Sequence, residues 1–292
     1  MEGLEFGQIG RMERGWLERR FEKEEILLVV TEMEGDKAPS LDGFSMAFFH
    51  HCWRVVKRDV LALFEEFYQH YKFEKSLNAT FIVLIPKKND ASNIRDFKPI
   101  RLVGNIYKIL AKVLANLLKV VLDQFISESQ NSFVGGRQIL DSVLFANKCV
   151  NSWVKSKILG VICKLDIEKA YDRVNWGALL NLLKKMGFGE NLTSADFFGS
   201  SRGLRQENLL SPMLFLVMME VFSRIVKRIE GVGLLSDFRA DGRRGGGECV
   251  SHLLFANDTI LFCDANVEQL LHVRLLPHCF QAMTGLKVNV SK

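Results

Sequence analysis

The stretch HLLFANDTILFC, His252 to Cys263, sets two apolar runs on either side of the polar pair Asn257-Asp258. Short runs rich in Leu, Ile and Phe, interrupted by turn-forming residues, predict the two strands of a hairpin. The first strand would contain Leu253 to Phe255 and the second Ile260 to Phe262, with the turn centred on Asn257-Asp258. The hairpin would therefore carry an amide and a carboxylate at its tip.

Strands and helices are mixed along the rest of the chain. FIVLIP at 81–86 and GVICKLDI at 160–167 predict two more strands. Apolar residues at helical spacing predict helices at 106–126, 137–154, 176–189 and 211–231. The last of these would begin with Ser211 as N-cap and end at Gly231. This mixture predicts an α+β fold.

The composition excludes several classes of protein. The 292 residues are 48% hydrophobic and 25% charged, with a net charge of +5 and six cysteines. The cysteines show no CxxC spacing, which argues against a zinc site or a disulfide framework. The longest apolar stretch is shorter than the roughly 18 residues that a bilayer requires. The charged N-terminus lacks the apolar segment of a secretory signal, so an intracellular protein of the nucleus or cytoplasm is expected, without a membrane partner.

Two carboxylates stand out once the strands are placed. Asp166 follows the apolar run at 160–165, near the C-terminal end of its predicted strand, and Asp258 lies in the predicted hairpin. Like charges on adjacent strand ends of an apolar sheet are costly unless a cation neutralises them. Mg²⁺ prefers such oxygen ligands, with water and substrate phosphates completing its shell. Taken singly, Asp166 could cap a following helix and Asp258 could be an ordinary turn aspartate.

Seven ordered blocks of the sequence carry a resemblance to a known family, over about Leu17 to Lys292. They are GDKAPSLDGF, FIVLIPKKNDASNIRDFKPIRLVGNIYKILAKVLANLLK, ISESQNSFVGGRQILDSV, KLDIEKAYDRVNW, GLRQENLLSPMLF, HLLFANDTILFC and GLKVNVSK. In these blocks the chain resembles the reverse transcriptase domain of a LINE-type, non-LTR retrotransposon of the kind abundant in plant genomes.

The resemblance implies a fold and a reaction. The fold would be a right-hand polymerase arrangement of fingers and palm, with an antiparallel palm sheet backed by helices and the thumb absent. A charged lead-in would cover 1–35, fingers and the start of the palm 36–160, and the palm 161–292. The reaction would be RNA-directed transfer of a deoxynucleotide from its triphosphate onto a primer 3′ hydroxyl, with Mg²⁺ or Mn²⁺ as cofactor and an RNA template and DNA primer as partners. The oligomeric state is left open.

The same resemblance implies roles for individual residues. Asp166 and Asp258 would be metal ligands, and Tyr171 would crowd a ribose 2′ hydroxyl, although it could equally be a core tyrosine. Residues matching the positions that approach the nucleotide, the template or the pyrophosphate are Lys87, Lys98, Arg205, Gln206 and Lys292. Basic side chains suit a triphosphate and a phosphate backbone.

The sequence also departs from the family pattern. Asn257 stands where the family has the first aspartate of its paired motif, and an amide oxygen brings no negative charge to a metal. Glu207 stands where a glycine lets the backbone approach the substrate, and the connection at 190–201 is shorter than usual. These departures indicate a degenerate or truncated copy. Three hypotheses therefore stand: an impaired polymerase, a catalytically dead remnant that binds nucleic acid, and an interaction protein using helices 106–126 and 213–229.

Overall fold

A computed structural model describes most of the chain. The described residues are 1, 3–39, 43–74, 76–77, 79–157, 159–189, 201–205, 208–235 and 251–289. The chain forms two compact units. Unit 1 comprises Met1–Glu13, Lys119–Leu204 and Pro212–Lys292, and unit 2 comprises Arg14–Leu118 and Arg205–Ser211. Both contain helices and an antiparallel sheet, which confirms the predicted mixture of helix and strand. The expected boundaries at 35 and 160 stay predictions.

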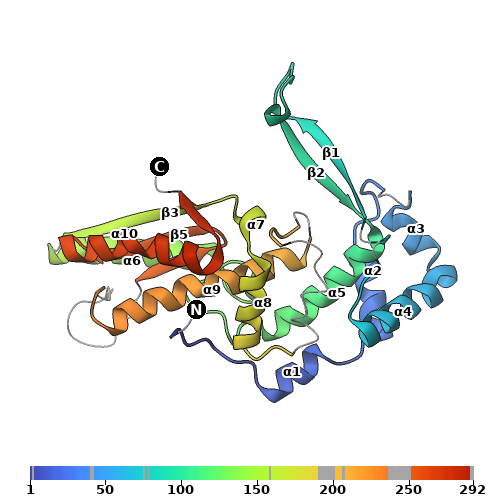
Figure 1. Ribbon diagram of the computed structural model, residues 1–292, viewed down its shortest axis with the longest axis horizontal. Coiled ribbons are helices and arrows are strands. Elements are labelled where there is room, and N and C mark those ends of the chain that lie inside the picture. Colours follow the sequence, from blue (N-terminus) through green and yellow to red (C-terminus); the bar gives the residue numbers. More distant parts are fainter. Residues whose placement is uncertain are drawn as a thin grey trace. The chain divides into compact units, whose positions relative to one another are not determined.

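Among the described residues, the sheet of unit 1 has four strands in the order β4-β5-β3-β6, all antiparallel. Figure 1 labels its strands β3 and β5. The strands are β3 (Gly160–Glu168), β4 (His252–Phe255), β5 (Asp258–Asp264) and β6 (Lys287–Asn289). The helices that lie wholly in this unit are α6 (Ile139–Ser156), α7 (Ala170–Arg173), α8 (Trp176–Lys185) and α10 (Val267–Thr284). Helices α1 (Arg11–Leu17), α5 (Asn105–Leu122) and α9 (Leu210–Gly231) contain residues of both units.

Helices cover both faces of this sheet. Neighbouring residues of a strand point to opposite faces. On β4, the His252 ring reaches α9, where its Nε2 lies 3.0 Å from the Ser223 Oγ. The next residue, Leu253, packs against Cys149 and Trp153 of α6. Helix α9 therefore packs on one face of the sheet and α6 on the other.

Helix α9 forms the centre of the core. Its segment from Leu214 to Phe222 is almost completely buried, which matches the apolar run MLFLVMMEVF that predicted the helix. Its N-terminus differs from the prediction, because the helix begins at Leu210 and Ser211 lies inside it. The side chain of Asn208 accepts a hydrogen bond from Leu210 N at 3.0 Å. Asn208 thus satisfies a backbone donor of the first turn, the role predicted for Ser211.

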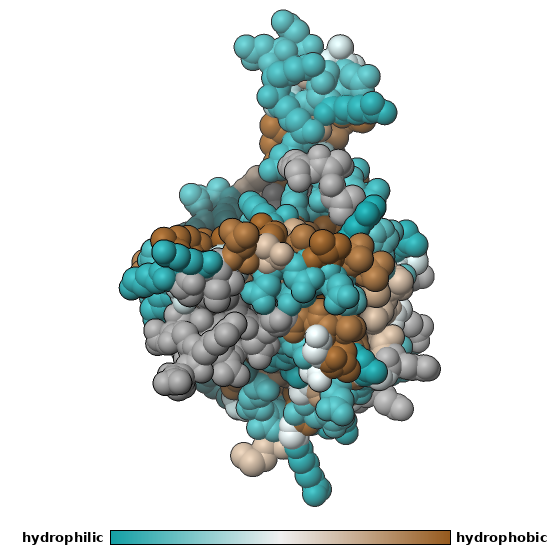
Figure 2. Space-filling view, turned by 90° about the vertical axis from the view of Figure 1, so that its left-hand side faces the viewer, coloured by the Kyte–Doolittle hydropathy of each residue, from teal (hydrophilic) through white to brown (hydrophobic). Residues whose placement is uncertain are grey.

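Helix α6 is apolar on its outer side as well. The residues Ile139, Leu140, Val143, Leu144 and Val150, whose spacing predicted the helix, are exposed, whereas Cys149 and Trp153 face the sheet. Figure 1 places α6 and α10 on its left-hand side. Figure 2 views the molecule from that side and shows apolar areas in brown. The predicted stripe is therefore present, but it faces outward.

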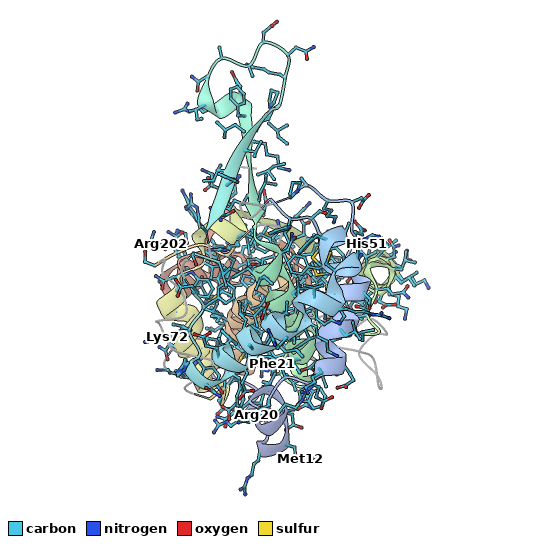
Figure 3. All side chains as sticks on the ribbon, turned by 90° about the vertical axis from the view of Figure 1, so that its right-hand side faces the viewer. Met12, Arg20, Phe21, His51, Lys72 and Arg202 are labelled. Atoms are coloured by element: carbon cyan, nitrogen blue, oxygen red, sulfur yellow. The ribbon has the colours of Figure 1, made fainter. Side chains whose placement is uncertain are left out.

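Unit 2 packs helices around aromatic side chains. Its helices α2 (Lys23–Glu32), α3 (Met46–His51) and α4 (Trp53–His70) contact one another in chain order. The Phe21 ring, labelled in Figure 3, meets the buried Phe64 ring edge-on at 5.2 Å between centroids. Asn105, which begins α5, is buried and donates from Nδ2 to Phe44 O at 2.6 Å. Aromatic packing and one buried amide thus hold these helices together.

The second sheet is a two-stranded ribbon in unit 2 formed by β1 (Thr80–Pro86) and β2 (Phe97–Val103), joined through the 3-10 turn η1 (Ile94–Asp96). The register runs from Thr80 opposite Val103 to Pro86 opposite Phe97. The five apolar residues from Phe81 to Ile85 are each between 41% and 61% exposed, so both faces of the ribbon are open to solvent.

Candidate active site

The sheet of unit 1 brings the two candidate carboxylates together. Strands β3 and β5 pair so that Asp166 lies directly opposite Asp258. Residues in this relation point to the same face, with Cα atoms about 4.5–5.5 Å apart. Asp166 is half-buried and Asp258 is exposed. The expectation that both aspartates lie on adjacent strand ends is therefore confirmed, while their role as metal ligands stays a prediction.

The hairpin tip differs by one residue from the prediction. Phe255 pairs with Asp258, so the two loop residues are Ala256 and Asn257, and Asp258 already belongs to β5. The pairing of Phe255 with Asp258 puts Ala256 at the first loop position, where its φ of 53° supplies the left-handed conformation that a tight hairpin needs. This conformation costs an L residue about 1 kcal/mol or more. Asn257 thus sits at the very tip, next to the opposed carboxylates.

A cation already stands beside the pair. The Lys164 Nζ lies 3.4 Å from Asp258 Oδ1, and the two side chains are 69% and 52% exposed. Lys164 and Asp166 are two residues apart on β3, so both point to the same face. Like charges directly opposed on a sheet are destabilising, and Lys164 offsets part of that repulsion. A pair this exposed contributes only about 0–1 kcal/mol.

Asp166 and Asp258 are the candidate ligands for a divalent ion. Over the described ranges of the chain, no cluster of three or more His, Cys, Asp or Glu side chains is placed to bind a metal. Two carboxylates from adjacent strands do fit an ion that takes one or two carboxylates and fills its shell with water and phosphate oxygens. On the other side of β3, Asn289 of β6 lies opposite Asp166. The predicted Lys292 lies outside the described residues.

Tyr171 lies on α7, directly after β3. The chain turns there at Lys169, whose φ of 47° is left-handed. The Tyr171 ring stacks on Phe215 of α9 at 5.3 Å, and burial raises the pKa of its hydroxyl. Its carbonyl accepts a hydrogen bond from Leu204 N at 2.7 Å. The beginning of the GLRQ stretch, Gly203-Leu204, therefore runs beside α7.

Of the remaining predicted residues, Arg205, Lys87 and Lys98 belong to unit 2, and Gln206 lies outside the described residues. The Arg205 guanidinium lies over the Tyr107 ring, 4.7 Å from its centroid. Tyr107 also accepts a hydrogen bond from Asn208 Nδ2 at 3.0 Å. Burial raises the pKa of Tyr107, although the adjacent Arg205 charge and the Asn208 bond act in the opposite direction.

The basic residues of the ribbon gather near its tip. Lys87, Lys88 and Arg95 lie in or beside the connection between β1 and β2, and Lys98 is exposed opposite Ile85. Lys88 binds Asp96 at 2.9 Å and holds the pKa of that carboxyl below its ordinary value. Lys87 donates to Arg95 O at 3.1 Å. The tip therefore presents positive charge on an apolar ribbon.

Two residues near the carboxylates escaped the sequence analysis. Lys164 could have been found, because the spacing of two in CKLD places it on the face of Asp166. Gln130 accepts a hydrogen bond from Ala256 N at the hairpin tip, at 3.2 Å, but the two residues are separated by 126 positions. Nothing in the local pattern of SQNSF indicates such a contact.

A cavity of about 520 Å³ lies elsewhere in unit 1. Its walls include Lys148 of α6, Lys227 and Glu230 of α9, and His252 and Leu253 of β4. Neither Asp166 nor Asp258 lines it. Both signs of charge occur in its walls, and the chemistry expected from the sequence belongs to the hairpin end of the sheet.

Comparison with known proteins identifies the class. A family model described as reverse transcriptase (RNA-dependent DNA polymerase) matches residues 85–292, more than half of the chain. The chain therefore belongs to the reverse transcriptase family. Members of that family use divalent metal ions and act on nucleic acids and nucleotides.

Individual relatives narrow this class. A Transposon TX1 uncharacterized 149 kDa protein of Xenopus laevis is 29% identical over 100% of this chain and 23% of its own length. A Retrovirus-related Pol polyprotein from a type-1 retrotransposable element R2 of Popillia japonica is 23% identical over 72% of this chain and 30% of its own. The chain thus spans less than a third of either relative. These likenesses confirm the resemblance to reverse transcriptase domains of LINE-type, non-LTR elements.

In the parts of the chain that the structure describes, every helix is too short or too polar to cross a bilayer.

Proposed function

We propose that this chain is the polymerase region of a plant LINE-type element, built to extend a DNA primer on an RNA template, and that Asn257 lowers its turnover. The proposal rests on one observation, the register that sets Asp166 opposite Asp258 with Asn257 at the adjoining tip. In this proposal residues 36–160 form the fingers and the start of the palm, and residues 161–292 form the palm.

The site residues would divide the work as follows. Asp166 and Asp258 would hold Mg²⁺ or Mn²⁺, which when bound neutralises phosphate charge and activates the attacking oxygen. Tyr171 would crowd a ribose 2′ hydroxyl and so favour deoxynucleotides. The cations Lys87, Lys98 and Arg205 would bind the triphosphate and the template by charge, and Gln206 would contribute to nucleotide binding as the resemblance implies. Lys292 would stabilise or protonate the leaving pyrophosphate.

Asn257 would weaken this machinery without removing it. An amide oxygen can ligate a hard cation but brings no negative charge, so the transition state would lose stabilisation. Since each 1.36 kcal/mol is a factor of ten, a loss of about 4 kcal/mol lowers turnover roughly a thousandfold. Two carboxylates and the Lys164 charge would remain at the site.

The test compares deoxynucleotide incorporation on a primed RNA template by the unmodified chain and by Asn257→Asp, each with Mg²⁺ and with Mn²⁺. We expect Asn257→Asp to extend the primer at least a hundredfold faster. The matched control combines Asn257→Asp with Asp166→Asn and should abolish the gain. If the unmodified chain is as fast as Asn257→Asp, the proposed impairment is wrong. If neither extends the primer, the polymerase proposal is wrong for this chain.

A catalytically dead remnant that still binds nucleic acid is the second candidate, favoured by the basic residues at the ribbon tip. It predicts that the unmodified chain binds a primed RNA template even when no variant extends it. Changing Lys87 and Lys98 together to Gln should then weaken binding and flatten its salt dependence. The third hypothesis was an interaction protein that binds partners through helices 106–126 and 213–229. It loses its support, because the apolar faces of α5 and α9 are buried within the chain.

A further inference from the structure

The loop between α5 and α6 covers the outer edge of β4. Strand β4 is an edge strand of its sheet, so its backbone groups need partners beyond β5. Leu254 N donates to Ser129 O at 2.8 Å, and Leu254 O accepts from Asn131 N at 3.0 Å. Gln130 and Leu254 thereby form a parallel bridge. Gln130 is thus fixed beside the strand that leads into the hairpin tip.

The Gln130 side chain reaches the tip itself. Its Oε1 accepts hydrogen bonds from Ala256 N at 3.2 Å and from Ser132 N at 3.1 Å. Both partners are N–H donors, so the oxygen must face them, and this fixes the orientation of the amide. The residue is 1% exposed, and its Nε2 is a buried donor with no partner among the described residues. A buried donor without a partner costs free energy. We therefore attribute the orientation of the amide to the two hydrogen bonds that its oxygen accepts.

The hydrogen bond from Ala256 N to Gln130 Oε1 falls at a strained position of the backbone. Ala256 is the left-handed residue of the loop, and it directly precedes Asn257 and Asp258. A strained conformation persists only where its surroundings over-determine it. Within the described residues, the bond from Gln130 is a contact from outside the hairpin that holds the Ala256 amide.

Gln130 is itself anchored to the core. The Arg137 Nη1 donates to Ser127 O at 2.7 Å and to Gln130 O at 2.8 Å. Glu220, buried on α9, accepts from Ser127 N at 2.9 Å and from Ser127 Oγ at 3.0 Å. A continuous set of hydrogen bonds therefore joins the central helix to the loop and the loop to the tip.

We infer that Gln130 is a positioning residue, which holds the hairpin tip so that positions 257 and 258 face Asp166. The inference rests on the proposed function for its catalytic consequence. The hydrogen bond to Ala256 can be tested whether or not the chain is an enzyme.

The experiment uses two variants of similar size. Gln130→Met keeps the volume and loses the acceptor, whereas Gln130→Glu keeps an acceptor for both N–H groups. Gln124→Met is the matched control, because Gln124 is exposed on the same connection and binds Glu13 at 3.3 Å. The first readout is hydrogen exchange of the Ala256 amide, with the Leu261 amide of β5 as internal reference.

We expect Gln130→Met to speed exchange at Ala256 about tenfold with little change at Leu261, and Gln130→Glu to retain most of the protection. Unchanged exchange at Ala256, or equal acceleration at both amides, would overturn the inference. The second readout is primer extension in the Asn257→Asp background. There Gln130→Met should lower kcat about tenfold or more with KM for the nucleotide little changed, and an unchanged kcat would overturn the catalytic part. If Asn257→Asp does not extend the primer, the polymerase proposal is refuted. The hydrogen-exchange result still shows whether Gln130 holds the Ala256 amide.

Discussion

Glu220 offers a test of the buried network that supports the hairpin. Its side chain is 1% exposed within the apolar core of α9 and accepts three hydrogen bonds, two from Ser127 and one from the Arg224 Nε at 2.6 Å. In Glu220→Ala, a buried N–H of Ser127 and the Arg224 guanidinium lose their partner. Breaking a buried pair costs about 3–5 kcal/mol, and an unsatisfied buried donor costs about 1–3 kcal/mol. Because the Arg224 side chain is 23% exposed and can regain water, we expect a net loss of about 3 kcal/mol.

The assay is urea unfolding followed by tryptophan fluorescence in a background with Trp16→Phe and Trp53→Phe, which leaves Trp153 and Trp176, both in unit 1. With a slope of about 2 kcal/mol per molar urea, the midpoint should fall by about 1.5 M. Glu128→Ala is the matched control, because Glu128 is exposed and follows Ser127 in the loop that Glu220 binds. It should change the free energy of unfolding by less than about 0.5 kcal/mol. A loss in Glu220→Ala no larger than in this control would refute the reasoning.

Two further predictions concern charge. Lys164→Met removes the cation 3.4 Å from Asp258 and should tighten Mn²⁺ binding up to about fivefold, measured from the electron paramagnetic resonance of free Mn²⁺. Unchanged or weaker binding would argue against a metal at this pair. Burial lowers the pKa of His252 to about 3, so the folded chain keeps its imidazole neutral while the unfolded chain protonates it below about pH 6.5. The free energy of unfolding should therefore fall by up to about 1.4 kcal/mol per pH unit from pH 6 to pH 4, and a His252→Gln variant with the same slope would contradict this cause.

The fold was predictable where one element carries its own signal. The strands at 160–167 and in the opening hairpin, and the helices α5, α6, α8 and α9, follow from local periodicity, which depends on one face of a helix or strand being apolar. The exposed stripe of α6 shows the limit of that reasoning, because periodicity marks two apolar sides alike and does not say which one meets the sheet.

The candidate site likewise has features that local sequence predicts and features that depend on long-range contacts. That Asp166 lies at the end of a strand followed from its place after an apolar run, whereas its position opposite Asp258 depends on the long-range pairing of β3 with β5. The turn was misplaced by one residue because Asn257-Asp258 is the better turn pair by composition, whereas the pairing of Phe255 with Asp258 puts Ala256 in the left-handed position. The strand register, which is set by the whole sheet, therefore overrides the local preference of Asn-Asp for the turn. The contact of Gln130 with this turn joins residues 126 positions apart, so no local pattern carries it.

On the proposed function, Asn257 would impair the chemistry of the site and not the folding of the hairpin. Asparagine is among the residues that tight turns favour, so Asn257 satisfies the tip as well as an aspartate would. The register of Asp166 with Asp258, the Gln130 contact and the Glu220 network each depend on residues that this chain retains. On that proposal, asparagine at position 257 would remove one negative charge and leave the scaffold that presents it. It follows that Asn257→Asp should leave the free energy of unfolding within about 0.5 kcal/mol of the unmodified chain, so any gain in primer extension would come from the restored charge alone.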